Sequence, residues 1–251
     1  MSSEKLLRPE VINVIFNALL GETTCMYLEY WPNQAPATQQ TTPLLGVPRD
    51  NLALWLKRII DITVSFTVLV LLSPLLLCVA ILIKLTSPGP VFHIRPQVGL
   101  NQRPFLMWKF RTMIANAEQQ EATLRQTLKT DGPFFKVKND PRITPLGKVL
   151  RKYSVDELPQ LLNVLKGEMS LVGPRPLFDF EVEKFSEWKY FQRFSMKPGL
   201  TCIWQVSGRS DTSDAHRMNG DLEYVKHWSL ALDFKILLKT IPVVLKGDGA
   251  V

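Results

Sequence analysis

The sequence predicts an α+β protein, mainly helical, in which a membrane segment precedes a small polar domain. One observation is a run without any charged residue from Ile62 to Ile83, in a chain of 251 residues. About 20 apolar residues are enough to span a bilayer, and a soluble helix of this length with no polar face is unusual. The other observation is the chain after Lys84, which turns to short extended segments and charged helical patterns. We therefore expect membrane insertion followed by a domain of mixed structure.

Charge and cysteine content narrow the function classes. The formal net charge is +7 and the pI is near 9.3, which suits an anionic partner such as a phosphate substrate, nucleic acid or anionic lipid surface. No helix-turn-helix, zinc-finger or RRM signature accompanies this charge, so we expect no nucleic-acid partner. Cys25, Cys78 and Cys202 lie far apart without metal-ligand spacing, which argues against a structural zinc site or a disulfide framework. The first ten residues lack the features of a signal peptide.

Composition divides the chain into three parts. Residues 1–50 form an N-terminal extension with a short apolar helix candidate at Glu10–Leu20, which is too short to span a membrane. The stretch Trp31–Pro48 is rich in Pro, Thr and Gln, a composition that predicts a flexible linker. Residues 51–90 form the membrane region, and residues 91–251 form the polar domain.

Periodicity predicts the elements that follow the linker. Asn51–Ile62 has helical periodicity and leads into the apolar run. Val91–Gly99 and Arg103–Met113 read as short strands, and their prolines disfavour a central position in a sheet. The last helical pattern is interrupted near Pro242, which predicts one or two amphipathic helices there. The helical patterns are Ile114–Lys129, Gly147–Tyr153, Leu158–Gly167, Phe180–Phe194 and Asp221–Gly247.

Ser73 and Pro74 interrupt the apolar run near its centre. Positive charge normally marks the cytoplasmic side of a membrane helix, and here both flanks of the run are basic. A helix hairpin that enters and leaves by one face resolves this conflict, because Pro74 lacks an N–H and bends the helix. The Ser73 hydroxyl can bond a carbonyl that Pro74 leaves without a donor. The alternative is an ordinary membrane-crossing helix with a proline kink.

Asp156 and Glu157 form an acidic pair directly before a helical pattern. One interpretation is helix capping, since Ser154–Glu157 matches the S-x-x-E capping box. The other is that the helix begins at Pro159, which suits the first helical position, so that both acids precede the helix. Asp and Glu together offer hard oxygen ligands suited to Mg²⁺, and a carboxylate can attack phosphorus.

Cations and flexible loops surround this acidic pair in sequence. Segments dense in Gly and Pro allow backbone amides and arginine side chains to approach phosphate oxygens closely. Any one of these cations, taken alone, is typical of a solvated face. Together with the acidic pair they indicate phosphoryl transfer, in which a divalent cation and arginines neutralise the charge. The cations are Lys109, Arg111, Arg151, Lys152, Arg175 and Arg209.

Several motifs resemble the bacterial sugar transferase family, the monotopic phosphoglycosyl transferases. They run in family order from about Leu54 to Thr240 and include "SPGPVFHIRPQVG", "FLMWKFRTM", "KPGLTCIWQVSGR" and "DLEYVKHWSLALDFKILLKT". The most specific block is "DPRITPLGKVLRKYSVDELPQLLNVLKGEMSLVGPRP". The resemblance implies transfer of a sugar-1-phosphate from a nucleoside diphosphate sugar, with a UDP-sugar expected, to polyprenyl (undecaprenyl) phosphate, with Mg²⁺ as cofactor.

The resemblance also implies roles for residues of this sequence. Asp156 matches the nucleophile that forms a covalent phosphosugar–aspartate, and Glu157 matches its metal or proton partner. Positions expected to line the phosphate site are Lys109, Arg175, Arg209 and Asp221. Arg111, two residues after Lys109, is expected to bind phosphate as well. The family's re-entrant helix breaks at a Ser-Pro pair, which matches Ser73 and Pro74.

The implied setting is the cytoplasmic face of a bacterial inner membrane, with residues 91–251 as a cytosolic catalytic domain and amphipathic helices at the interface. Such enzymes carry out the first membrane step of exopolysaccharide, O-antigen or glycoconjugate synthesis, and a homo-oligomer is compatible with this prediction. The sequence departs from the family at Cys202, where Gly is expected, and in residues 1–50. The alternative hypothesis is a non-catalytic membrane scaffold of a polysaccharide assembly complex.

Overall fold

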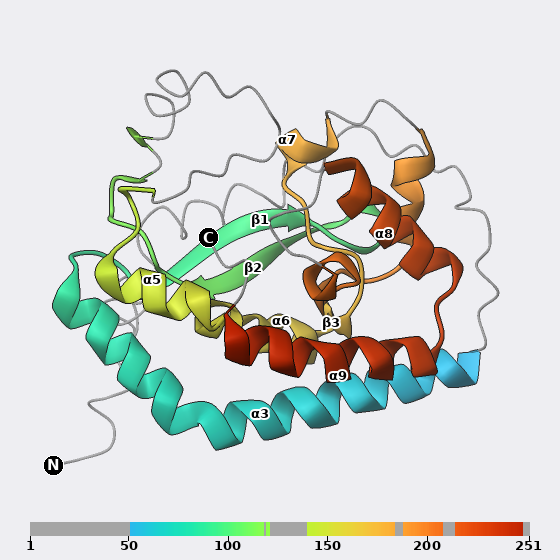
Figure 1. The fold of residues 1–251 in the computed structure, drawn as a ribbon, viewed down its shortest axis with the longest axis horizontal. Helices are drawn as coiled ribbons and strands as arrows, with labels where there is room; N and C mark the ends of the chain where they lie inside the picture. The colour runs from blue at the N-terminus through green and yellow to red at the C-terminus, as the bar shows by residue number, and fades with distance from the viewer. Residues whose placement is uncertain (1–50, 118, 121–139, 184–187, 208–213, 248–251) are drawn as a thin grey trace, which may run out of the picture.

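The structure is a computed structural model that describes residues 51–117, 119–120, 140–183, 188–207 and 214–247. The N-terminal extension, its helix candidate and the linker lie outside the described residues, as does most of the helical pattern at Ile114–Lys129. The described part is mainly helical with two small sheets, which confirms the α+β class (Figure 1). Short helices and two pairs of strands pack around one long helix, α3.

Helix α3 (Asn51–Thr86) contains the whole apolar run. It is one continuous helix with Pro74 inside it, and it changes direction along its length (Figure 1). Pro74 has no N–H for the carbonyl of Val70, and the Ser73 hydroxyl donates to that oxygen at 2.8 Å instead. The hydrogen bond expected of Ser73 is therefore present. The role of Ser73 and Pro74 in a re-entrant hairpin stays a prediction, since the structure shows one bent helix.

Most of α3 faces away from the protein. Among the described helices it is the one long and apolar enough to cross a membrane, and few residues of its apolar stretch are buried. Large side chains such as Phe66 (61% exposed) and Leu71 (70% exposed) are mostly uncovered by the described protein. A buried core helix would have its apolar surface covered, so this pattern supports a membrane environment for α3.

The two predicted strands pair as an antiparallel hairpin. β1 (Phe92–Val98) and β2 (Pro104–Phe110) are joined by a 3₁₀ turn, η3 (Leu100–Gln102), and the register places His93 opposite Lys109. Pro96 and Pro104 are tolerated because a sheet of two strands has only edges. A second, parallel pair joins β3 (Ser170–Val172) to β4 (Gly199–Thr201).

Short elements fill the space between the hairpin and the long helices. They are α5 (Pro145–Lys152), η4 (Val155–Glu157), α6 (Gln160–Lys166), α7 (Asp179–Val182), η5 (Trp188–Ser195) and η6 (Trp204–Val206). The helix expected at Phe180–Phe194 was wrong as a single helix: α7 is short, and η5 is a 3₁₀ helix. In η5 the aromatic residues Trp188, Phe191 and Phe194 follow the tighter three-residue period.

Two helices, α8 (Asp214–Lys226) and α9 (Leu230–Lys246), end the described chain. The predicted interruption near Pro242 was misplaced, because the break falls at Ser229, whose hydroxyl accepts from the Leu232 N–H at 3.2 Å and caps α9. α9 continues through Pro242 and runs beside the first half of α3 (Figure 1). The main core lies between these helices, α6 and the strands, and includes Met107, Val164, Met169, Val172, Tyr224 and Ile236.

Candidate active site

The acidic pair lies in its own 3₁₀ turn, η4, between α5 and α6. Ser154 precedes the turn in the left-handed conformation (φ 54°), and its side chain makes no capping hydrogen bond. α6 begins at Gln160, with Pro159 as its N-cap. The capping-box interpretation was therefore wrong, and the interpretation in which Asp156 and Glu157 precede the helix is confirmed.

Asp156 is a buried carboxyl group with only 8% of its surface exposed. Its pKa is raised to about 6, chiefly because burial in a low-dielectric environment disfavours the charged form and secondly because Glu157 repels that charge. Lys109 and Arg151 act in the opposite direction. A carboxyl group with a pKa shifted by burial and by its charged neighbours is typical of catalytic sites.

Lys109 reaches this turn from β2. Its Nζ lies 2.7 Å from Oε1 of Glu157, and each side chain is about a quarter exposed. The contact joins the strand hairpin to η4, as the predicted convergence of Lys109 with the acidic pair requires. The pair leaves the Glu157 carboxylate partly open to a ligand.

Arg151 is the second cation at the acidic pair. It projects from α5, and its Nε donates to the Thr112 hydroxyl at 2.9 Å. Burial lowers the pKa of Arg151, while the charges of Asp156 and Asp140 oppose that shift. The sequence marked Arg151 only as one of several nearby cations, because spacing along the chain does not show which of them faces the carboxylates.

Asn163 is a buried side chain that the sequence did not mark. Its Nδ2 donates to the carbonyl of Leu106 and to Oε2 of Glu168, both at 2.6 Å, and its Oδ1 accepts from the Trp108 N–H at 3.1 Å. These bonds fix α6 to β2 on either side of Met107, two residues before Lys109. An Asn inside a short apolar helix is the signal that could have found it, since such a side chain needs hydrogen-bond partners.

Arg175 lies in the loop after β3. β3 and β4 approach so closely that a Cβ on Gly199 would lie 2.1 Å from the Gly173 nitrogen, so only glycine fits there. The Arg175 guanidinium lies over the ring of Trp204, 5.4 Å from its centroid. The contacts of Arg175 are made with this part of the molecule rather than with the acidic pair.

Arg111 and Asp221 differ from the expected phosphate-lining positions. The Arg111 guanidinium donates to the Pro88 carbonyl and, at 2.9 Å, to the carbonyl and hydroxyl of Ser87, so it holds the loop after α3. Asp221 is 2% exposed and pairs with Arg193. Both charged groups therefore bond to other parts of the protein. Residue spacing along the sequence does not reveal this direction. Arg209 lies outside the described residues.

The acidic pair also bears on the expected Mg²⁺. Within the described residues no cluster of three or more His, Cys, Asp or Glu side chains could hold a metal ion. Mg²⁺ commonly binds through one or two carboxylates with waters and substrate phosphates, so two adjacent acids fit that pattern. The mutual repulsion that raises the pKa of Asp156 is what a divalent cation would relieve.

The fold and this site define a class: a chain with an exposed apolar helix and a buried carboxyl group set among cations. The family model described as "Bacterial sugar transferase" matches residues 52–247, and the chain belongs to this family.

Curated relatives extend the comparison. The chain is 44% identical over 204 residues to the UDP-galactose-lipid carrier transferase of Erwinia amylovora, which covers 78% of this chain and 42% of that protein. It is 39% identical over 226 residues to the exopolysaccharide production protein ExoY of Sinorhizobium fredii, covering 85% and 98%. It is 39% identical over 207 residues to the UDP-glucose:undecaprenyl-phosphate glucose-1-phosphate transferase of Escherichia coli, covering 80% and 41%. The chain thus spans less than half of two relatives and nearly all of ExoY.

Proposed function

We propose that this protein transfers a sugar-1-phosphate from a UDP-sugar to undecaprenyl phosphate. The observation that carries the proposal is Asp156, a buried carboxyl group with a pKa of about 6, next to the Lys109–Glu157 pair. Relatives named for galactose and glucose transfer to this lipid support the same reaction class. The match to ExoY indicates a role in exopolysaccharide synthesis.

The reaction proceeds in two displacements. A carboxylate oxygen of Asp156 attacks the β-phosphorus of the UDP-sugar, the bond to the bridging oxygen breaks, and UMP leaves. A phosphate oxygen of undecaprenyl phosphate then attacks the phosphosugar–aspartate, which forms the lipid diphosphate sugar and restores the carboxylate. Lys109 and Arg175 neutralise phosphate charge in both steps. Asp156 and Glu157 would hold Mg²⁺ together with the substrate phosphates, and the ion would supply further charge neutralisation.

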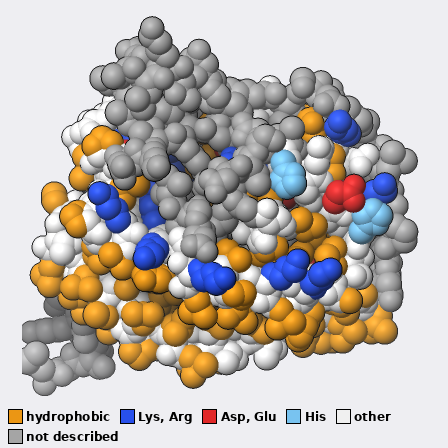
Figure 2. All heavy atoms as spheres, viewed as in Figure 1, with side chains coloured by type: hydrophobic (Ala, Val, Ile, Leu, Met, Phe, Trp, Pro, Cys, Tyr) orange, Lys and Arg blue, Asp and Glu red, His pale blue; other side chains and the backbone are white. Residues whose placement is uncertain are grey.

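The proposed place of this chemistry is the cytoplasmic face of the inner membrane. Hydrophobic side chains gather over α3 and α9, with a row of Lys and Arg side chains beside them (Figure 2). An apolar band edged by basic residues suits a membrane interface with anionic lipids. The phosphate of the long-chain lipid and the soluble nucleotide sugar then meet at the level of the lipid headgroups.

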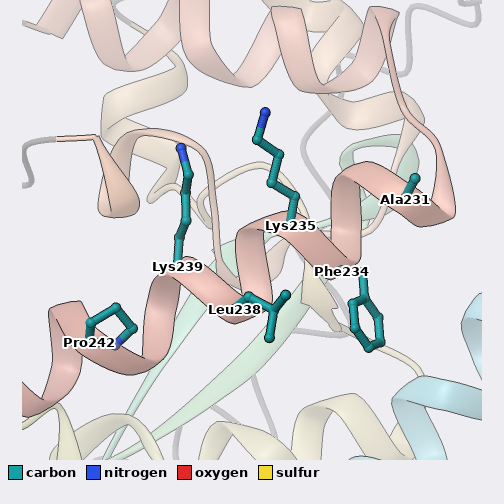
Figure 3. A pocket seen from close by; sticks show the side chains of 6 residues that line it. All are labelled: Ala231, Phe234, Lys235, Leu238, Lys239 and Pro242. Carbon is teal, nitrogen blue, oxygen red and sulfur yellow. The ribbon is translucent and has the colours of Figure 1, made fainter.

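α9 is the clearest interfacial element. It lines an open groove of about 650 Å³ with its own side chains, among them Phe234, Lys235, Leu238 and Lys239. Lys235 and Lys239 extend in one direction, while Phe234 and Leu238 point to the other side (Figure 3). Its one acidic residue, Asp233, is buried, so the exposed face is apolar and basic. This supports the predicted amphipathic interfacial helix.

A labelling experiment tests the re-entrant topology of α3. Single cysteines replace Asn51 and Thr86, both exposed at the ends of α3, in a chain whose Cys25 and Cys78 are replaced by serine. A membrane-impermeant maleimide should label both positions in inverted vesicles and neither in spheroplasts. The buried thiol of Cys202, whose pKa burial raises, should stay unlabelled. Labelling of the two ends from opposite sides would show a crossing helix.

A turnover assay tests the function itself. Purified protein is given undecaprenyl phosphate and a panel of UDP-sugars with Mg²⁺, and UMP is measured. UMP should appear with at least one sugar, and Asp156→Asn should reduce the rate by at least about a thousandfold, because the nucleophile is lost. Glu223→Gln, on the exposed face of α8, is the control and should keep the wild-type rate. If no sugar of the panel gives UMP, the scaffold hypothesis is favoured. If Asp156→Asn turns over at the wild-type rate, Asp156 is not the nucleophile.

A further inference from the structure

A buried ion pair contacts the backbone of the loop that carries Arg175. Arg193, from η5, and Asp221, from α8, are each 2% exposed, and Nη2 of Arg193 lies 2.6 Å from Oδ2 of Asp221. Burial raises the pKa of Asp221 and lowers that of Arg193, so each charge depends on the other. A buried ion pair adds little net stability by itself, because the cost of removing both charges from water offsets much of their attraction. Its remaining contacts indicate another role.

Both backbone polar groups of Arg175 are bound by this ion pair. The Arg175 N–H donates to Oδ1 of Asp221 at 3.2 Å, and Nη2 of Arg193 donates to the Arg175 carbonyl. The second arm of Arg193 is also engaged, since Nη1 donates to Sδ of Met218 at 3.3 Å. The peptide groups on either side of Arg175 are thereby held by two charged side chains from separate elements.

The side chain of Arg175 has a third support. Its guanidinium lies 5.4 Å from the ring centroid of Trp204, and the Arg217 guanidinium lies 5.1 Å from the same centroid. Trp204 is 4% exposed, so its ring is fixed by packing. A cation over an indole ring is held by the ring quadrupole. The backbone contacts and the ring together fix where the Arg175 guanidinium can point.

We propose that Arg193 is a positioning residue that acts through Arg175. With Asp221 it holds the backbone of Arg175 so that the guanidinium meets the diphosphate of the nucleotide sugar. The planar fork of an arginine can pair with a carboxylate and reach a carbonyl and a sulfur at once, which a lysine ammonium cannot reproduce. The inference rests on the proposed function, and it gives Asp221 a supporting role in place of direct phosphate binding.

A double-mutant cycle on nucleotide-sugar binding tests the inference without turnover. All proteins carry Asp156→Asn, and UDP-glucose and UDP-galactose are titrated by calorimetry into the parent, Arg193→Lys, Arg175→Ala and the double variant. Arg193→Lys should weaken binding about tenfold when Arg175 is present and less than about twofold when it is absent, because neighbouring residues that act as one unit are not additive. Melting temperatures show that each protein is folded. If Arg193→Lys does not fold, Asp221→Asn, which keeps an oxygen for the Arg175 N–H, takes its place.

The outcomes separate this inference from the proposed function. Equal weakening by Arg193→Lys in both backgrounds would show a general structural role and overturn the inference, as would wild-type binding by a folded variant. Binding by the parent of neither of these nucleotide sugars, nor of any other UDP-sugar of the turnover panel, would overturn the proposed function and the inference with it. In turnover-competent protein, the KM for the UDP-sugar should rise about tenfold while the KM for undecaprenyl phosphate stays constant.

Discussion

Asp156 is held in surroundings that oppose its charge. The side chain is buried, and the neighbouring Glu157 repels the carboxylate, so the pKa lies at about 6 instead of 3.8. The ionised form is therefore less favourable in the folded protein than in the unfolded chain. The contribution of Asp156 to native stability therefore falls as pH rises from about 4 to 6, and it stays lower above that range.

Asp156→Asn should stabilise the protein at pH 8. The amide carries no charge to desolvate, so the gain is up to about 3 kcal/mol, given about 1.4 kcal/mol per pKa unit. The gain should vanish near pH 4, where the wild-type carboxyl is protonated in the folded state. Melting curves at both pH values, recorded with EDTA to remove divalent cations, measure it. A variant that melts below the wild type at pH 8 would contradict this account.

Lys109 should set the pH range of activity. Its charge lowers the pKa of Asp156, so Lys109→Met should move the acidic limb of kcat/KM for UMP release to higher pH. The rate should fall at least about tenfold at pH 6.5 and recover in part at pH 8. Lys148→Met, an exposed lysine on α5, is the matched control. An unchanged limb in Lys109→Met would show that the lysine does not act on Asp156.

The side-chain types at the site could be read from the sequence, but their directions could not. The acidic pair and Lys109 meet as expected, because β2, which carries Lys109, packs against η4, which carries the pair. Arg111 and Asp221 have the right chemistry for phosphate but bond to protein groups. Arg193 looked like one charge among many in an aromatic helix pattern, and only tertiary packing shows that it is buried against Asp221.

At the scale of elements, capping hydrogen bonds determine where helices begin, and the pattern of apolar residues alone does not predict these boundaries. Pro242 marks a weak point in the pattern of α9, yet the helix continues because the packed face of α9 outweighs one missing hydrogen bond. The break falls at Ser229, whose hydroxyl caps the new helix. In α3 the same logic applies at Pro74, where Ser73 supplies the missing donor to Val70.

The Ser73–Val70 bond should matter only while residue 74 is proline. Ser73→Ala should destabilise the protein by about 1 kcal/mol, since a carbonyl in hydrocarbon loses its donor. In the Pro74→Ala background the same change should cost almost nothing, because the substituted alanine has a backbone N–H that bonds to the Val70 carbonyl. Melting temperatures in one detergent measure the four proteins. An equal loss in both backgrounds would show that the hydroxyl acts elsewhere.

At the scale of the whole molecule, charged residues join the membrane helix to the domain. Arg58 donates to the Val164 and Leu165 carbonyls at 2.6 and 2.7 Å, which caps the end of α6, and Asp61 accepts from the Leu171 N–H at 3.0 Å. The first half of α3 is therefore attached to the helix that follows the acidic pair. In the sequence Arg58 is only part of the basic flank of the apolar run. The docking contacts of Arg58 and Asp61 depend on partners more than 100 positions away.

A third link is made by Lys57, which is also buried. Its Nζ lies 2.6 Å from Asp233 and bonds the Val172 carbonyl at 2.9 Å, while Tyr224 donates to Asp233 at 2.7 Å. Lys57→Met should destabilise the protein by about 3–5 kcal/mol, because Asp233 then stays buried without a counterion. Lys57→Met with Asp233→Leu should recover much of that loss, since two apolar side chains replace the pair.

Thermal unfolding of the full chain in detergent measures the Lys57 effect. Lys235→Met, on the exposed face of α9, makes the same chemical change and should alter the melting temperature by less than about 1 °C, since exposed charges contribute little. UMP release should fall with the loss of folded protein in Lys57→Met and return in the double variant. If the double variant melts as low as Lys57→Met, the pair is not what attaches α3. If it melts higher but stays inactive, the link also sets how the site stands relative to the membrane.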